Sequence, residues 1–248
     1  MCNFIHSSSG YRTDTYSMGL KLNILQDIEE DILKVHNSCN NLKMLELGDQ
    51  IIRPHLNPAK QYWQDKGFEH TSVDVNGKHD SIIKDLSIFE QFTDWKDTYD
   101  VVYNMGTSEH VEPFDAQYTC FKIADHCCKV NGIMIHGVPE VNKRDKEKKF
   151  TKHCHYYYSE KFFDTLIKES NYKFINKRYT TGGCVYYAFQ KTAQSEFMSN
   201  KELFLSNIAI RNKDINFSKD SNYVFQKNAW GGKPIFREAV TQIFKPRS

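Results

Sequence analysis

The chain lacks an excess of charge of either sign. Its 248 residues carry 33 lysines and arginines against 31 aspartates and glutamates, which gives a formal net charge of +2 at pH 7. Nucleic acids and acidic membrane surfaces attract proteins that present a strongly basic patch or stripe. The composition therefore favours neither kind of partner.

Other features are missing as well. No stretch approaches the ~20 consecutive apolar residues that a membrane-spanning helix needs, and the first residues, MCNFIHSSSGYRTDTY, lack a basic segment followed by an apolar run. The seven cysteines form no paired CxxC motifs, which disfavours both a disulfide framework and a structural zinc module. These absences predict a cytoplasmic protein with reduced thiols.

What the chain does contain is enough apolar material for one main domain. Hydrophobic residues make up 40% and aromatic residues 14% of the sequence. Segments of helical periodicity alternate with short apolar strands, as the crossover connections of a mainly parallel sheet require. Tyr172–Tyr179 and Cys184–Gln190 are typical of a closing antiparallel hairpin. We expect an α/β domain over residues 20–191, an N-terminal extension or lid (1–19) and a C-terminal appendage (192–248).

Polar residues follow three of the predicted strands. LELGDQ ends the strand that begins at Leu42, HTSVDVNG places Asp74 after the next strand, and NMGTSEHV follows the strand Tyr99–Tyr103. Ligands of open α/β sheets bind outside the carboxyl ends of the strands, where an acid can accept hydrogen bonds from both ribose hydroxyls. The sequence therefore predicts a nucleoside site. No G-x-G-x-x-G follows the first strand, which disfavours a dinucleotide oxidoreductase.

From about Leu42 to Gln190, the order of these segments resembles the class I S-adenosylmethionine-dependent methyltransferases. The resemblance implies a Rossmann-like, mainly parallel sheet of seven strands with helices on both faces and the last strand antiparallel. It also implies S-adenosylmethionine as methyl donor and S-adenosylhomocysteine as product. LELGDQ departs from the family's longer glycine motif, because Gln50 replaces the later glycine. The cofactor-binding positions implied by the resemblance are Glu46, Gly48, Gln50, Asp74, Asn76, Asp85, Leu86, Asn104, Met105 and Gly106.

The pair Glu109-His110 directs attention to the methyl acceptor. Transfer to a hydroxyl requires alignment of the reacting atoms and removal of a proton, and histidine, with an unperturbed pKa near ~6.5, suits that proton transfer. We expect His110 or His136 to act as the base, and Glu109 to orient it or to bind a substrate hydroxyl. The expected substrate-binding residues are Ser108, His153, His155 and Tyr157.

Each of these residues also has a purely structural interpretation. Acids and amides are common at strand ends, turns and helix caps, and Glu109 and His110 could simply serve the backbone. SEHV is also similar to the Glu-His pair that ligates a divalent ion in the ubiquinone-pathway O-methyltransferases and the small-RNA 3′-end methyltransferases. Here Gly106 replaces the earlier glutamate of that pattern, so a metal is not favoured.

In detail, LELGDQ, HTSVDVNG, NMGTSEHV and GIMIHGVPE resemble bacterial methyltransferases associated with surface-polysaccharide and other small-molecule modification. This resemblance implies O-methylation of a small polar acceptor, either a sugar or a phosphorylated metabolite. N-methylation is the enzymatic alternative. A nucleoside-binding domain that has lost its chemistry and serves as a partner subunit is the alternative of another class. The oligomeric state stays open, and a homodimer is one of the options.

Overall fold

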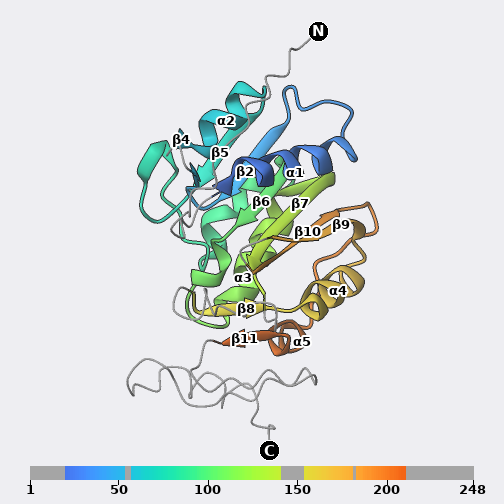
Figure 1. Ribbon diagram of the computed structural model, residues 1–248. Coiled ribbons are helices and arrows are strands. Elements are labelled where there is room, and N and C mark those ends of the chain that lie inside the picture. Colours follow the sequence, from blue (N-terminus) through green and yellow to red (C-terminus); the bar gives the residue numbers. More distant parts are fainter. Residues whose placement is uncertain (1–19, 54–56, 141–153, 181–182, 211–248) are drawn as a thin grey trace, which may run out of the picture.

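A computed structural model describes residues 20–53, 57–140, 154–180 and 183–210, and all structural statements below concern these ranges. Their centre is a six-stranded sheet in the order β5-β2-β6-β7-β10-β9 (Figure 1). The first four of these strands run parallel, whereas β10 pairs antiparallel with both β7 and β9. The strands are β2 (Lys43–Leu47), β5 (Glu69–Val73), β6 (Tyr99–Met105), β7 (Cys128–Pro139), β9 (Lys173–Tyr179) and β10 (Cys184–Gln190).

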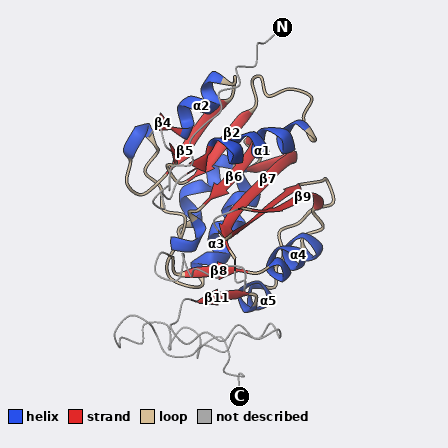
Figure 2. Ribbon diagram, viewed as in Figure 1, coloured by secondary structure: helices blue, strands red, loops and turns tan. Residues whose placement is uncertain are grey.

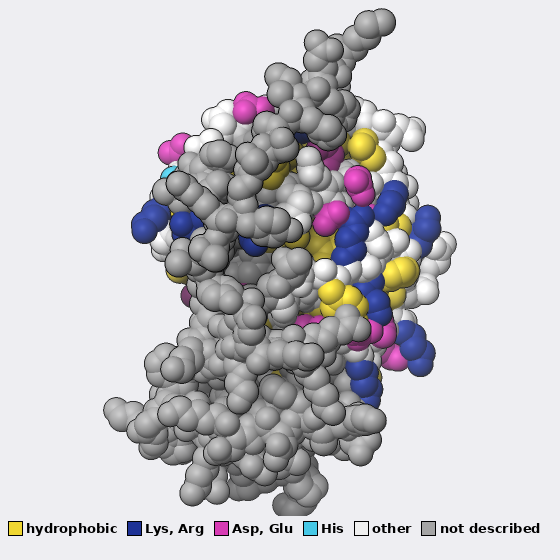
Figure 3. All heavy atoms as spheres, in the orientation of Figure 1, with side chains coloured by type: hydrophobic (Ala, Val, Ile, Leu, Met, Phe, Trp, Pro, Cys, Tyr) yellow, Lys and Arg dark blue, Asp and Glu magenta, His cyan; other side chains and the backbone are white. Residues whose placement is uncertain are grey.

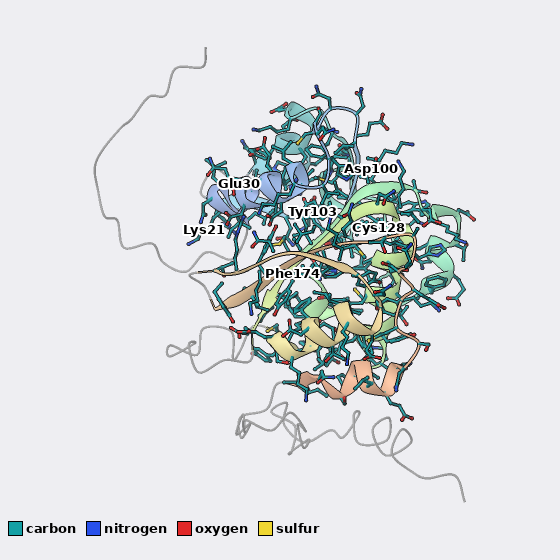
Figure 4. All side chains as sticks on the ribbon, turned by 90° about the vertical axis from the view of Figure 1, so that its right-hand side faces the viewer. Lys21, Glu30, Asp100, Tyr103, Cys128 and Phe174 are labelled. Carbon is teal, nitrogen blue, oxygen red and sulfur yellow. The ribbon has the colours of Figure 1, made fainter. Side chains whose placement is uncertain are left out.

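Helices cover both faces of this sheet (Figure 2). α1 (Leu22–Leu33) and α2 (Ala59–Asp65) pack on one face. α3 (Ala116–Cys127), α4 (Glu160–Glu169) and α5 (Lys201–Ser206) pack on the other. The alternation of side chains along β6 supplies both cores, because Val101, Tyr103 and Met105 join the α1 side while Val102 joins the α3 side. Tyr103 is buried on the α1 side of the sheet (Figure 4).

Two small sheets flank the main one, and the sequence did not predict them. β1 (Leu20–Lys21), β3 (Ile51–Arg53) and β4 (Asn57–Pro58) form the first. β8 (Tyr156–Tyr158) and β11 (Ile208–Ile210) form the second. These strands have only two or three residues, which is too short for an alternating hydrophobic pattern to be recognised.

The α/β fold class is confirmed, but the main sheet has six strands in the described part of the chain rather than the expected seven. Before Asp85-Leu86, only Ile82 forms an isolated parallel bridge, to Val73. The following segment hydrogen-bonds to itself, since the Asp85 N–H donates to the Gln91 side chain at 2.8 Å and the Ser87 N–H donates to the Asp85 carboxylate at 2.8 Å. These backbone groups are therefore not available to extend a strand.

The expected boundary at residue 191 does not separate two packing units. Phe204, Leu205 and Ile208 belong to the main core, and the Tyr118 hydroxyl donates a hydrogen bond of 2.9 Å to the Met198 carbonyl. Residues 192–210 thus complete the α3 side of the domain. The extension 1–19, the segment 141–153 and residues 211–248 lie outside the described ranges.

The described surface mixes charges of both signs. On the face drawn in Figure 3, lysine and arginine side chains stand beside aspartate and glutamate side chains. Arg178 on β9, for example, contacts Asp27 at 2.6 Å and Glu30 at 3.3 Å, both on α1. Among the described residues, no helix is both long enough and apolar enough to cross a membrane.

Candidate functional site

A tight turn at Gly48 brings the ends of β2, β5 and β6 together. Gly48 has a φ of +102°, and its N–H donates a hydrogen bond of 2.8 Å to the Val73 carbonyl. A Cβ built on this glycine would lie only 2.1 Å from Thr107 Oγ1, so a side chain here would force Thr107 to move. The Gln50 side chain also reaches across, with Nε2 donating to Thr107 Oγ1 at 3.3 Å. Gln50, which replaces the second glycine, therefore ties the turn to β6.

Glu46 supports this turn from the interior. Its side chain is 1% exposed, and Oε1 accepts the Gln50 N–H at 3.1 Å. His70 on β5 lies on the other side, with Nε2 at 3.2 Å from Glu46 Oε2. Burial raises the pKa of Glu46, while the neighbouring His70 opposes that rise. The expected cofactor residue is thus placed beneath the turn. His70, which sequence reasoning missed, is its partner.

Asp74 stands at the end of β5 and organises the adjacent loop. Its Oδ2 accepts the Asp49 N–H at 3.1 Å, and its Oδ1 accepts the Asn76 N–H at 2.9 Å. His79, in the short 3-10 helix Lys78–Asp80, returns to the glycine turn, where Nδ1 lies 2.7 Å from Asp49 Oδ2. His79 was not identified from the sequence, because nothing local indicates its partner thirty residues earlier in the chain. Asp74 and Gly48 are thereby held in one connected edge.

The segment around the expected cofactor positions Asp85 and Leu86 presents apolar side chains beside Asp74. Leu86 is buried, whereas Asp85 is partly exposed. Val75 is 68% exposed and Ile83 is 72% exposed. Ile83 packs against Gly77, and the backbone of Ile82 bonds to Ser72 and Asp74 at 2.8 and 3.2 Å, so this segment lies next to the end of β5. Ile82 is exposed as well, so several large apolar side chains are exposed close together here, and such a cluster, unlike a single exposed residue, marks the edge as a candidate binding surface.

At the end of β6, where Asn104, Met105 and Gly106 are expected to supply a backbone wall to the cofactor, the side chains of Asn104 and Met105 are buried. Asn104 is fully buried, and its Oδ1 accepts the N–H groups of Thr107 and Ser108 at 3.3 and 3.1 Å. Met105 points into the α1 core and fills the space above Gly137. Ser108 is also buried, since it accepts from the Asn104 amide at 2.8 Å and from the Tyr158 hydroxyl at 3.0 Å. These side chains fix the turn, and Gly106 is left at its partly exposed surface.

His136 lies in the core rather than at the edge. Its ring is stacked between Phe121, at 4.6 Å between centroids, and Phe189, at 5.5 Å. Nδ1 lies 3.2 Å from the Asn104 amide nitrogen, which is the donor. Burial lowers the pKa of His136 to about 3. An imidazole enclosed in this way has no access to an acceptor, so His136 is not carried forward as a base.

Glu109 is a buried carboxyl group beneath Gly106. It is 2% exposed, and its Oε2 has no hydrogen-bond partner among the described residues. A Cβ built on Gly106 would lie 3.5 Å from Glu109 Oε1, so the carboxyl group sits close under that glycine. Burial raises the pKa of Glu109 to about 8, which keeps the group mostly protonated at neutral pH. A neutral acid there is a hydrogen-bond donor.

His110 is exposed at the same edge, and its ring centroid lies 6.4 Å from that of His155. His155 is hydrogen-bonded through Nδ1 to Glu112, a residue the sequence did not single out. Tyr157 is 5% exposed and belongs to a small apolar cluster with Cys154 and Ala209, so it is not presented to a substrate. His153 lies outside the described residues. Within the described ranges, no group of three or more acidic, histidine or cysteine side chains is arranged to hold a metal ion.

Comparisons with known proteins give only a distant structural likeness. No protein-family model and no curated protein sequence matches the chain. Among solved structures, the chain is similar to 1,6-didemethyltoxoflavin-N1-methyltransferase of Burkholderia thailandensis, with 14% identity, 68% of this chain and 83% of the other covered, and a TM-score of 0.47. The chain is also similar to the PH0226 protein of Pyrococcus horikoshii, with 14% identity, 68% of this chain and 90% of the other covered, and a TM-score of 0.48. For N-methyltransferase NodS of Bradyrhizobium japonicum, the identity is 12%, 69% of this chain and 98% of the other are covered, and the TM-score is 0.45. We assign no activity to this chain on these likenesses.

Proposed function

We propose that the chain is an S-adenosylmethionine-dependent methyltransferase that methylates an oxygen of a small polar acceptor. The observation that carries the proposal is the joined edge at the ends of β2 and β5. There, the glycine turn and the Asp74 carboxylate are linked directly through the Asp49 N–H. The order of the sequence motifs predicts a nucleoside site at this edge. Ligands of open α/β sheets bind at such strand ends.

The side chains of this edge suit a nucleoside. Each carboxylate oxygen can accept two hydrogen bonds, so Asp74 can receive ribose hydroxyls in addition to its two backbone donors. The exposed Val75 and Ile83 offer apolar surface for a flat base, next to the partly exposed Asp85. When bound, S-adenosylmethionine supplies a methyl group on a positively charged sulfur. The chain's residues need only align an acceptor and remove its proton.

The end of β6 is the proposed acceptor side. Glu109 and His110 belong to the 3-10 helix Ser108–His110, which follows the turn at Gly106 and Thr107. Glu109 is a buried, protonated hydrogen-bond donor beneath Gly106, and the exposed His110 and its neighbour His155 are the candidate proton acceptors on this side. A sugar or phosphorylated metabolite and surface-polysaccharide biosynthesis belong to this proposal through the resemblance of the sequence motifs, and a cytoplasmic location belongs to it as the expectation from the sequence composition.

The first experiment separates the nucleoside site from the fold. Calorimetric titration of the full chain with S-adenosylmethionine and S-adenosylhomocysteine is expected to give one saturable site. Asp74→Ala should weaken binding by at least about 10- to 100-fold, because even one hydrogen bond to a charged group contributes about 1.5–3 kcal/mol. Asp100→Ala is the matched control. Asp100 also accepts a backbone N–H, that of Lys43 at 2.9 Å. It lies near the start of β6, however, and so at the edge of the parallel sheet opposite to Asp74 (Figure 4).

Equal losses in the two variants would indicate a general loss of structure and would contradict a specific role for Asp74. Transfer of a radiolabelled methyl group to a panel of nucleotide sugars, sugar phosphates and amines then separates O- from N-methylation. Binding without any transfer would favour the non-catalytic alternative.

A further inference from the structure

An imidazole–carboxylate pair that the proposed function has not used lies at the acceptor side. Glu112 follows the 3-10 helix Ser108–His110, and His155 immediately precedes β8. His155 Nδ1 is hydrogen-bonded to Glu112 Oε1. The Tyr156 hydroxyl donates to Glu112 Oε2 at 2.7 Å. Both oxygens of the carboxylate therefore have a fixed partner.

The backbone places this pair beside Glu109 and His110. The His155 N–H donates to the Glu109 carbonyl at 3.0 Å, which joins the start of β8 to the turn after β6. Gln117 on α3 holds the same turn, since Nε2 donates to the carbonyls of Ser108 and Val111 at 2.7 Å each. Tyr156 is fully buried and is a rigid support for Glu112. The pair is thus positioned by β8, α3 and the end of β6 together.

The pairing decides which nitrogen of His155 carries the proton. A carboxylate accepts hydrogen bonds, so Nδ1 must be the donor and the neutral ring has its lone pair on Nε2. A carboxylate in this position orients the imidazole and stabilises the cation formed when Nε2 takes a proton. The side chains of His155 and Glu112 are 33% and 34% exposed, so solvent screens their attraction and orientation matters more than pairing energy.

We propose that His155 Nε2 takes the proton of the acceptor hydroxyl, with Glu112 and Tyr156 as positioning residues. This inference rests on the proposed methyl transfer. As the acceptor oxygen forms its bond to the methyl carbon, its O–H bond breaks and the proton moves to Nε2. The carbon–sulfur bond breaks with its electron pair left on sulfur, which yields S-adenosylhomocysteine, and the proton later leaves His155 for water.

Nitrogen-15 NMR of the full chain tests the pairing without any substrate. The His155 signals are assigned by their loss in His155→Gln. At a pH where the ring is neutral, the wild-type spectrum is expected to show His155 protonated on Nδ1. Glu112→Ala should shift this ring towards the Nε2-protonated form, whereas His126→Gln on α3, which removes an imidazole bonded to the Thr93 carbonyl, should leave it unchanged. A wild-type His155 protonated on Nε2 would overturn the proposal.

Kinetics test the role of the pair in transfer. With an acceptor that turns over in the panel of nucleotide sugars and sugar phosphates, His155→Gln should lower kcat by about 10²–10⁴-fold, while the affinity for S-adenosylhomocysteine stays within about twofold of wild type. Glu112→Ala and Tyr156→Phe should lower kcat progressively less. A larger loss in His110→Gln than in His155→Gln would overturn the assignment. If the proposed function itself is wrong, the chain will not bind the nucleoside, although His155 is still protonated on Nδ1. That result differs from the outcomes that refute the role of His155.

Discussion

The buried carboxyl group of Glu109 predicts an unusual dependence of stability on pH. In the unfolded chain, this group titrates near its ordinary value of 4.5, whereas burial raises its pKa to about 8 in the folded protein. Between these values the folded state binds the extra proton, so the free energy of unfolding falls as pH rises through this range. The stabilising contribution is complete below pH 4.5 and is lost by about pH 8.

Glu109→Gln removes this dependence while it preserves the shape of the side chain. The difference between 4.5 and about 8 corresponds to a free energy on the order of 5 kcal/mol. We expect the stability of the variant relative to wild type to increase by an amount of that order as pH rises from the acidic to the alkaline end. Loss or gain of a contact by the amide adds a constant offset, so the pH-dependent part is the diagnostic quantity.

Urea unfolding at a series of pH values measures this quantity through midpoints and slopes. Glu169→Gln, which removes an exposed carboxylate on α4, controls for the change in net charge. If the difference between Glu109→Gln and wild type were independent of pH, Glu109 would have to be ionised or well partnered in the folded protein. The assignment of a neutral hydrogen-bond donor beneath Gly106 would then be wrong.

Three further predictions concern single side chains of the candidate site. Burial lowers the pKa of His136 from 6.5 to about 3, so its stabilising contribution is present above pH 6.5 and is lost as pH falls towards 3. His136→Phe should therefore make the free energy of unfolding fall less steeply as pH drops below 6.5. An unchanged slope in that range would contradict this. Gly48→Ala should cost about 1–3 kcal/mol of unfolding free energy, because it forces a side chain into the left-handed region and against Thr107; Gly48→Ala combined with Thr107→Gly should recover part of that loss in thermal unfolding. His79→Ala frees the loop after Asp74 from Asp49 and should weaken S-adenosylhomocysteine about two- to tenfold by calorimetry, with an unchanged melting temperature as the check on folding.

The sequence predicts the elements that depend on local patterns. Gly48 and Asp74 are identified because each stands where an apolar strand ends, and that signal survives without any knowledge of tertiary contacts. The hairpin of β9 and β10 is confirmed for the same reason, since its two halves are adjacent in the chain. The lack of a full strand before Asp85 was not predicted, because it depends on the hydrogen bond from the Asp85 N–H to the Gln91 side chain.

Side-chain roles that depend on distant partners escape the sequence. His136 follows the predicted strand pattern, but only its neighbours from α3 and β10 determine that the ring is sealed in the core. His70 and His79 gain their partners through the packing of β5 and its loop against the glycine turn. Glu112 carries no signal of its own, and its pairing with His155 becomes visible only when β8 is placed beside β6.

A crystal structure of the full chain with S-adenosylhomocysteine tests the central claim most directly. The account predicts the ribose hydroxyls on the Asp74 carboxylate, the base against Val75 and Ile83, and the sulfur facing the side of the site that holds Glu109 and His155. A nucleoside bound elsewhere, or no bound nucleoside in crystals grown with millimolar ligand, would contradict the account.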